Sequence, residues 1–347
     1  MTNTSRTPCV AAFGEILLRL KAPGHERLLQ SATLEATFAG AEANVLAALS
    51  ADGIATRMIS VLPAGVIGDA AVGELRRHAV DTSHIVRREG RLGTYYLESG
   101  AGPRPSRVLY DRSYTAFTLS EPDVIDWHAA LDGVSWLHLT GITPALNDAM
   151  AAMTVNAART ATAMGITVSC DYNHRASLWS HRRPAPPVMR ALMPFVQIGI
   201  AGTSDCQVML GVESPAGPST DDVHDESRCI AERTLAEFPS LSLQAITRRD
   251  GESAGRYGWS ACAMDRSGFH VSRRYQIDEV IDRVGSGDAF AAGLLYGLLT
   301  GRSNAASLEF ATAAACLKHT IPGDVNRVSA AEVDALLAGQ GGGRIAR

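Results

Sequence analysis

The segment from Val280 to Phe290 constrains this chain most, because a Gly-x-Gly-Asp turn lies there between a strand-like run and an apolar helical run. Glycines at positions 285 and 287 let the backbone approach a ligand closely. The N–H groups that open the following helix point at that ligand with the positive end of the helix dipole. The sequence therefore predicts a strand, an anion-binding turn and an apolar helix in succession.

Asp288 closes this turn and has two interpretations. A carboxylate beside an anion is electrostatically unfavourable unless it takes a proton from a nucleophile that attacks the anion, which is the role of the base in phosphoryl transfer. Alternatively, Asp288 only caps the helix that runs through Ala292, Leu295 and Leu299, since Asp is among the favoured capping residues. The turn by itself leaves both interpretations open.

Strand and helix patterns alternate along most of the chain, which is typical of an α/β protein with a doubly wound, mostly parallel sheet. The expected strands cover residues 9–20, 56–61, 136–139, 166–170, 195–200 and 244–247. The expected helices cover residues 41–52, 69–78, 148–164 and 222–237. We expect a single domain over residues 9–337, with flexible tails at 1–8 and 339–347.

Residues 92–117 interrupt this pattern, because two alternating segments flank a loop rich in glycine and proline and so predict a β-hairpin. Side chains alternate between the two faces of a strand, which puts Tyr110 and Arg112 on one face of the second strand and Thr94 and Tyr96 on one face of the first. A polar and aromatic face on a protruding hairpin indicates that the hairpin is a lid that covers a binding site. A solvated edge ribbon or a dimer contact is the alternative.

The composition favours a globular enzyme that acts on small metabolites. The chain has 347 residues, of which 46% are apolar, and this is enough for a large core. A net charge of -4 without a basic tract argues against a nucleic-acid partner. No apolar run approaches the length of a membrane span, and the first residues lack the apolar core of a signal peptide, so we expect no membrane association and a cytoplasmic location. The six cysteines show no metal-ligand spacing, so neither zinc nor disulfides are expected.

The sequence contains no GxxxxGK[ST] loop, no GxGxxG that opens a βαβ unit, no GxSxG elbow and no HExxH. Residues 282–293 instead resemble the D-x-x-G-x-G-D motif of the ribokinase-like (PfkB) carbohydrate kinases. Residues 38–45 are similar to the Gly-Gly-x-x-x-Asn segment of that family, and residues 65–69 to its G-x-x-G-D segment. Within the family the chain is most similar to 2-dehydro-3-deoxygluconate kinases, through residues 14–20, 110–112, 171–179 and 318–326.

This resemblance implies a ribokinase-like fold, in which the sugar binds between the main sheet and a small β lid formed here by about residues 13–41 and 92–117. It implies ATP-dependent phosphorylation of the primary hydroxyl of a 2-keto-3-deoxy sugar acid, from 2-dehydro-3-deoxygluconate to its 6-phosphate. Asp288 would be the base, and the transferred phosphoryl group would be stabilised by the N–H groups of Gly285, Ser286 and Gly287. The implied cofactors are ATP and Mg2+, with a monovalent cation as a further candidate.

The resemblance also implies two sets of binding residues. The substrate-binding residues would be Gly40, Asn44, Tyr96, Tyr110, Arg112, Arg175 and Asp324. The nucleotide-binding residues would be Asn173, Thr247, Arg249, Gly251, Gly285, Gly287 and Asn326. Because a guanidinium matches a carboxylate with two parallel hydrogen bonds, two arginines favour a sugar acid over a neutral sugar.

One departure from the family pattern concerns the metal. Many relatives carry Asn-x-x-Glu after a central strand, where this chain has Gly202-Thr203-Ser204-Asp205. The amide is missing, and Asp205 would be the acidic group that orients magnesium-bound water. Two alternatives to the sugar-acid kinase stay open: a kinase for a neutral ketose such as fructose, and a sugar-binding pseudokinase. Pairing of lids into a homo-oligomer is a further expectation.

Overall fold

A computed structural model of the chain describes residues 8–179, 183–213, 224–251 and 255–340. Its main element is a ten-stranded sheet whose strands are parallel from β5 to β11, with antiparallel strands beyond β11. In spatial order the strands are β13 (Gly268–Val271), β12 (Tyr257–Asp265), β11 (Leu243–Gly251), β10 (Ile198–Gly202), β9 (Thr167–Asp171), β8 (Trp136–Thr140), β1 (Cys9–Phe13), β4 (Ala55–Pro63) and β5 (Ile85–Arg88), and β14 (Tyr275–Ile277) also pairs with β12. The predicted doubly wound, mostly parallel sheet is confirmed.

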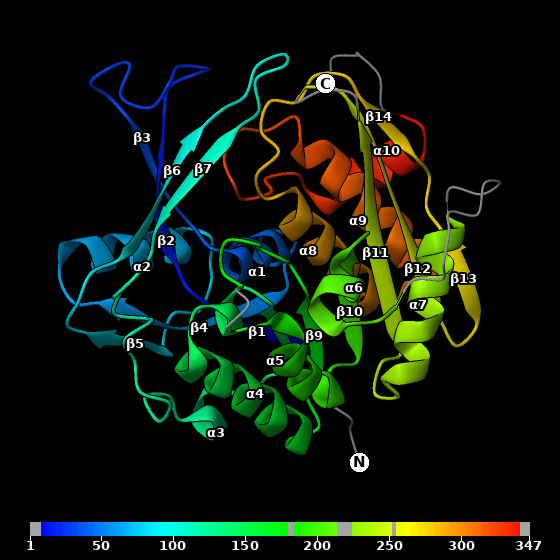
Figure 1. Cartoon of the computed structure of the whole chain (residues 1–347), viewed down its shortest axis with the longest axis horizontal. Coiled ribbons are helices and arrows are strands. Elements are labelled where there is room, and N and C mark those ends of the chain that lie inside the picture. The colour runs from blue at the N-terminus through cyan, green and yellow to red at the C-terminus, as the bar shows by residue number, and fades with distance from the viewer. Residues whose placement is uncertain (1–7, 180–182, 214–223, 252–254, 341–347) are drawn as a thin grey trace.

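Helices cover both faces of this sheet (Figure 1). The α-helices are α1 (Ala41–Ala51), α2 (Val66–Arg77), α3 (Trp127–Ala130), α4 (Asp148–Ala163), α5 (Ala185–Leu192), α6 (Asp205–Leu210), α7 (Asp225–Glu237), α8 (Ser286–Leu299), α9 (Asn304–Lys318) and α10 (Ala330–Leu337). Several begin at caps that the sequence supplies. The Asn147 side chain accepts the Met150 N–H at the start of α4, and a capping box joins Ser329 and Glu332 at α10.

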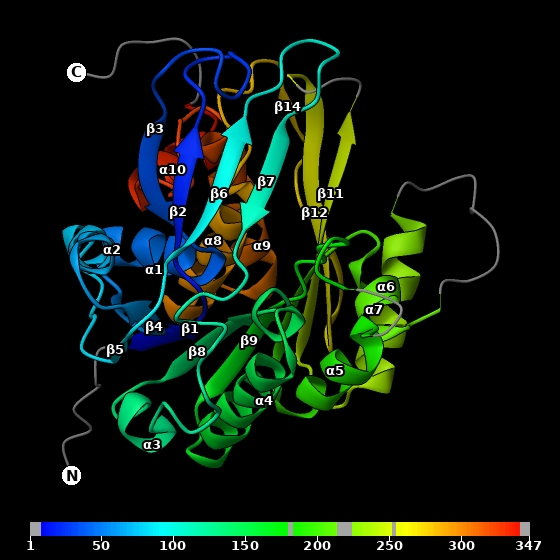
Figure 2. The ribbon, with the colours of Figure 1, turned by 60° about the vertical axis from the view of Figure 1, so that its left-hand side comes forward.

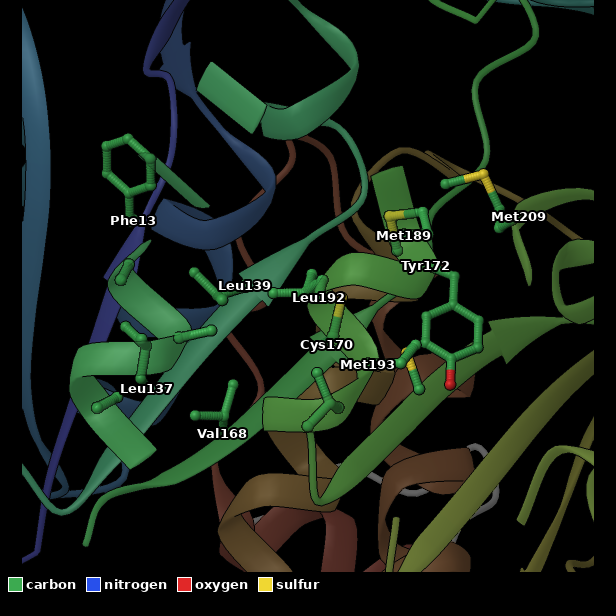
Figure 3. Close-up of a cluster of buried hydrophobic side chains, with 14 of the residues drawn as sticks. Phe13, Leu137, Leu139, Val168, Cys170, Tyr172, Met189, Leu192, Met193 and Met209 are labelled. Carbon is green, nitrogen blue, oxygen red and sulfur yellow. The ribbon is translucent and has the colours of Figure 1, made fainter. Parts of the chain in front are cut away.

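The two faces of β1 belong to two different cores. Ala11 and Phe13 pack with the helices α4, α5 and α7, whereas Val10 and Ala12 pack with α1, α8 and α9. Figure 3 shows part of the first core, which contains Phe13, the β8 leucines Leu137 and Leu139, and the helix methionines Met189 and Met209. A strand that is buried on both faces has a continuous apolar sequence, which is why this strand shows no alternation.

A second, four-stranded sheet forms the lid. Its strands are, in spatial order, β3 (Glu35–Ala39), β2 (Leu17–Lys21), β6 (Gly93–Glu98) and β7 (Arg107–Asp111). Figures 1 and 2 show these strands rising from the body of the molecule above α1 and α2. The hairpin predicted within residues 92–117 is therefore present as β6 and β7, and it belongs to a separate small sheet as expected.

The prediction of one strand over residues 9–20 is wrong. The segment forms β1 in the central sheet and β2 in the lid, and the chain passes from one sheet to the other at Gly14, Glu15 and Ile16. All three of these residues are buried, so the crossing lacks the exposed polar residues that usually mark a loop, although Gly14 and Glu15 do interrupt the apolar run. The crossing matters for the site, because Glu15 within it and Leu17 just after it line the cavity described below.

Other boundaries differ by a few residues. The helix predicted for residues 69–78 begins at Val66, and α7 spans Asp225–Glu237, while residues 222 and 223 lie outside the described residues. The predicted tails lie mostly outside them as well. In the described part of the chain, no helix combines the length and apolar character that crossing a bilayer requires.

Candidate active site

A cavity of about 690 Å³ lies between the lid and the carboxyl ends of the central strands. Leu17, Tyr95 and Tyr110 line it from the lid strands. Asp171 and Gly202, the last residues of β9 and β10, line it from the central sheet. Open α/β sheets bind their ligands at this edge. The cavity also contains the start of α8, so the predicted anion-binding turn opens into it.

The turn before α8 has the geometry that its glycines predict, but the strand predicted just before it is absent, because residues 280–284 have no strand structure. Gly285 is the N-cap of α8, with a left-handed φ of 82°, and a Cβ atom at this position would overlap the carbonyl oxygen of Asp324. Gly285, Ser286 and Gly287 all line the cavity. The Ser286 N–H donates to the Arg283 carbonyl at 3.3 Å, so this donor is partly used within the turn. The positive end of the α8 dipole thus faces the cavity.

Asp288 lies in the first turn of α8, and Gly285 rather than Asp288 occupies the N-cap position. The Asp288 Oδ2 atom accepts a hydrogen bond of 2.7 Å from the Asn44 Nδ2 atom. Burial is the main cause that raises the pKa of Asp288, to about 7; the Asn44 hydrogen bond and the Arg175 charge act to lower it, and the Asp324 carboxylate acts to raise it. A carboxylate with this pKa can hold or release a proton near neutral pH, which suits a general base.

Asp171 and Asp205 are two of the other carboxylates that line the cavity. Burial, followed by the charges of Asp205 and Asp288, raises the pKa of Asp171 to about 8. Asp171 accepts the N–H of Asn173 at 3.1 Å, and Asp205 accepts the N–H of Gly202 at 2.8 Å. Across the described residues, no three His, Cys, Asp or Glu side chains are grouped so that they could hold a metal ion by themselves.

The far end of the cavity is formed by β11 and its neighbours. The Thr247 hydroxyl donates to the Ala201 carbonyl at 3.2 Å, and the Thr203 hydroxyl donates to the Thr247 carbonyl at 3.3 Å. Arg249 is exposed, and its guanidinium lies 5.5 Å from the centre of the Tyr257 ring. Thr247 and Arg249 line the cavity, as does Asn173. The structure therefore brings these three predicted nucleotide-binding residues into the lining of the cavity.

The lid places Arg112 in an ion pair. The Glu15 Oε2 atom accepts hydrogen bonds from Arg112 Nε at 2.8 Å and Nη2 at 2.6 Å, and the Thr115 hydroxyl donates to the other Glu15 oxygen at 2.9 Å. The guanidinium also lies 5.6 Å from the centre of the Tyr110 ring. A guanidinium has five N–H donors, so Glu15 leaves three of them for other acceptors. Arg112 is thus held in one orientation by side chains that line the cavity.

Arg175 approaches from the opposite side. It follows β9, its side chain is exposed, and its Nη1 atom donates to the His174 carbonyl at 3.0 Å. Its charge acts to lower the pKa of both Asp171 and Asp288. Arg112 and Arg175 both line the cavity, together with the predicted substrate-binding residues Gly40, Asn44, Tyr110 and Asp324.

Tyr96 is not in the cavity, and its neighbour Tyr95 takes the expected place. In the register of β6 and β7, Tyr95 pairs with Tyr110 and Tyr96 pairs with Leu109. Directly opposed residues share a face, so a register shifted by one residue exchanges the two tyrosines. The Tyr95 hydroxyl donates to the Asp324 carboxylate.

Two predicted nucleotide-binding residues also lie outside the cavity. Gly251 is the last residue of β11, where it pairs with Tyr257. Asn326 is buried beside α1 and α9, and its Oδ1 atom accepts the Val328 N–H at 3.2 Å. Asn326 therefore shapes a loop, and the loop in turn brings Asp324 to the cavity.

Sequence reasoning missed several cavity residues, namely Glu15, Glu42, Tyr95, Asp171 and Trp259. Glu15 lies two residues after the last residue of β1 and Asp171 is the last residue of β9, and acidic residues at the carboxyl end of a strand were a usable signal. Glu42 is buried, accepts a 2.7 Å bond from the Thr140 hydroxyl and has its pKa raised by burial. Its partner lies 98 residues away, which no local pattern could reveal.

The chain is similar to known proteins in sequence and in fold. Over residues 8–330 the chain matches the family described as "pfkB family carbohydrate kinase". A 2-dehydro-3-deoxygalactonokinase from Haloferax volcanii is 31% identical over 95% of this chain and 96% of its own length. The crystal structure of 2-dehydro-3-deoxygluconokinase from Thermotoga maritima is 39% identical, with a TM-score of 0.89 over 95% of this chain and 99% of that one.

More distant structures share the fold alone. A putative ribokinase II from E. coli, in complex with ATP and Mg2+, is 17% identical with a TM-score of 0.73, and it covers 95% of this chain. The family match and the two closer relatives each extend over nearly the whole sequence. The chain therefore belongs to the pfkB family of carbohydrate kinases.

Proposed function

We propose that this kinase uses ATP to phosphorylate the primary hydroxyl of a 2-keto-3-deoxy sugar acid, converting 2-dehydro-3-deoxygluconate to its 6-phosphate. The observation that carries the proposal is the position of Asp288, an ionisable carboxylate that lines the cavity beside the Gly285–Gly287 turn. Asp288 takes the proton of the sugar hydroxyl as that oxygen attacks the terminal phosphoryl group of ATP. The N-terminal dipole of α8 and the N–H groups of the turn stabilise the charge that builds on the phosphoryl oxygens.

Two arginines support the sugar-acid substrate. Arg112 reaches the cavity from the lid and Arg175 from the end of β9, so a carboxylate between them would meet two guanidinium groups. The relatives support the same class, because their names specify 2-dehydro-3-deoxy sugar acids. Gly40 and Asn44 contact the sugar hydroxyls. Tyr95 takes the place on the lid that was expected for Tyr96.

ATP occupies the end of the cavity near Thr247 and Arg249. A Mg2+ ion, when bound, neutralises charge on the phosphates. Asp205 and Asp171 are the nearby carboxylates that fit such an ion, and since Mg2+ usually keeps several waters and binds through one or two carboxylates plus phosphates, a complete protein cage is not needed. Asp205 already accepts the Gly202 N–H and so presents a fixed oxygen.

A neutral ketose such as fructose is the second candidate, and the Glu15–Arg112 ion pair favours it, because Glu15 offsets one of the two positive charges. Three further expectations belong to the proposal: a monovalent cation that supports turnover, a homo-oligomer that pairs through the lid, and a cytoplasmic location. A potassium titration of the rate and a light-scattering mass test the first two, and cell fractionation tests the third.

The test of the proposal is the Asp288→Asn variant. Asparagine keeps the size of the side chain and an oxygen that can accept the Asn44 hydrogen bond, but it cannot take a proton. Turnover of 2-dehydro-3-deoxygluconate, measured by coupled ADP release, should fall by about 100- to 10,000-fold. Sugar binding, measured by calorimetry, should be largely unchanged. A variant that keeps more than about a tenth of the wild-type rate would remove Asp288 from the base role, whereas a wild-type protein that binds the sugar but releases no ADP would support the pseudokinase alternative.

A further inference from the structure

We propose that Arg19 is a positioning residue for phosphoryl transfer. It links the lid to two loops, the one that contains Asp282 and leads into the anion-binding turn, and the one that contains Asp324 and packs against that turn. This inference rests on the proposed roles of Asp288 and the Gly285–Gly287 turn, and it goes beyond them by assigning a task to a side chain outside the cavity. Arg19 belongs to lid strand β2 and is 2% exposed. A buried arginine requires acceptors for its charged N–H groups, and it finds them in both loops.

The guanidinium of Arg19 bridges two carboxylates that are distant in sequence. Its Nη2 atom donates to the Asp282 Oδ2 atom at 2.6 Å, and its Nη1 atom donates to the Asp324 Oδ1 atom. Asp282 precedes the turn and Asp324 follows α9, so one planar group joins three segments. Both carboxylates are also buried, which leaves little solvent screening between them and the guanidinium.

Asp282 connects the Arg19 guanidinium to the backbone of the turn. Its Oδ1 atom accepts the N–H of Val284 at 3.0 Å, and its Oδ2 atom also accepts the N–H of Gly323 at 3.1 Å. Val284 is the residue before Gly285 and packs against the buried lid residues Leu17 and Leu97. The orientation of the peptide groups that lead into the anion-binding turn therefore depends on where the Asp282 carboxylate is held.

Asp324 constrains the turn from the other side. Its carbonyl oxygen lies so close to Gly285 that no Cβ atom would fit there, while its carboxylate receives both Arg19 and the Tyr95 hydroxyl from the lid. The buried ammonium of Lys318 closes the same region by donating to the carbonyls of Asp282 at 3.3 Å and Ile321 at 3.0 Å. A shift of the lid strands is thus transmitted directly to the backbone of the turn.

The planar fork of arginine suits this task better than the ammonium of lysine. Nη1 and Nη2 can reach two carboxylates at once in a fixed plane, whereas a lysine presents a single charged centre on a flexible stem. The arrangement therefore sets the distance between the lid, which holds the sugar, and the turn, which holds the transferred phosphoryl group. Rates of group transfer are sensitive to such distances, and a displacement of about 1 Å can cost about 100-fold.

Arg19→Met and Arg19→Lys test the inference, with Arg57→Met as the matched control. Arg57 also pairs with an aspartate, Asp81, and with two backbone carbonyls, but it does not line the cavity. We expect Arg19→Met to lower kcat by about 100-fold and Arg19→Lys by about 10-fold, with KM for the sugar acid and for MgATP within about threefold of wild type. Arg57→Met should lower Tm and leave kcat unchanged.

A double-mutant cycle with Asp282→Asn identifies the partner. If Arg19 acts through Asp282, the double variant loses about as much kcat as the more severe single variant, whereas independent roles would multiply the losses. Should Arg19→Met fail to fold, Arg19→Lys and Asp282→Asn decide the question.

A kcat within about twofold of wild type in Arg19→Lys and Asp282→Asn, or a rise in sugar KM alone, would overturn the inference. The proposed function is judged separately, because the wild-type rate on 2-dehydro-3-deoxygluconate and the Asp288→Asn variant test it, whatever the Arg19 variants do.

Discussion

The pH dependence of the rate gives a direct test of Asp288. Burial and the neighbouring Asp324 carboxylate place the pKa of Asp288 at about 7, and a general base works only when it is ionised. With that pKa, about a tenth of the enzyme is ionised at pH 6 and about nine tenths at pH 8. We therefore expect kcat/KM for 2-dehydro-3-deoxygluconate to rise about tenfold between these two pH values, at saturating MgATP.

The Asn44→Ala variant tests in which direction the pKa of Asp288 moves when a hydrogen-bond donor is removed. Asn44 donates a hydrogen bond to the Asp288 carboxylate and so favours its ionised form. Removing this donor should move the rising limb of the profile to higher pH, in addition to any loss of sugar affinity. Asn147→Ala is the control, since Asn147 caps α4 outside the cavity and its loss should not move the limb.

Thermal stability provides an independent check. The pKa of Asp288 is raised in the folded protein, so ionisation opposes folding, and this penalty is absent below the unfolded pKa of about 4 and complete above pH 7. Asp288→Asn removes the penalty, and its gain in Tm over wild type should therefore grow from pH 4 to pH 7. A flat kcat/KM between pH 5.5 and 8, or a limb that moves to lower pH in Asn44→Ala, would refute an Asp288 base with a raised pKa.

Two other predictions concern the substrate and the metal. Arg112→Ala and Arg175→Ala should each lower kcat/KM for 2-dehydro-3-deoxygluconate by about 10- to 150-fold, the value of one charge-assisted hydrogen bond, while any activity on fructose changes only a few-fold. Equal losses on both sugars, measured by coupled ADP release, would contradict a shared carboxylate site. Gly202→Asn should lower the Mg2+ concentration needed for half-maximal rate. The Asp205 carboxylate lies 3.2 Å from the position that a Cβ atom would take at Gly202. An unchanged Mg2+ titration would show that Asp205 already supplies the metal-binding contribution expected from the asparagine amide.

The sequence predicted the turn, the helix behind it and the surrounding strands and helices well, because these elements depend on residues that are close together in the sequence. The glycines of the turn, the helix behind it and the alternation of strands and helices each leave a pattern within about twenty residues. Gly285 is a good example, since both its left-handed φ and its close approach to Asp324 demand glycine. The placement of Asp288, Asn44, Thr247 and Arg175 in one cavity then follows from the position of the carboxyl ends of parallel strands and the helix starts beside them.

The errors arose where geometry depends on register or on contacts far apart in sequence. The loop between β6 and β7 does not reveal which residues pair, so the face of Tyr96 was assigned incorrectly. Asn326 and Gly251 were chosen from the family pattern, but Asn326 accepts the Val328 N–H and Gly251 pairs with Tyr257 in the sheet. The ion pair of Arg112 with Glu15 joins residues 97 positions apart, and periodicity carries no information about it.

The site is assembled from the two ends of the chain. Asn44 and Asp288 are separated by 244 residues, and Arg19 and Asp324 by 305. During synthesis on the ribosome, the lid and the proposed sugar-binding segment are made long before the proposed base and the turn ahead of α8. A nascent or prematurely terminated chain that ends before residue 282 therefore contains proposed sugar-binding side chains such as Asn44, but neither Asp288 nor the Gly285–Gly287 turn. On the proposed mechanism such fragments cannot transfer phosphate from ATP, and the chain acquires this capacity only when its last fifth has emerged.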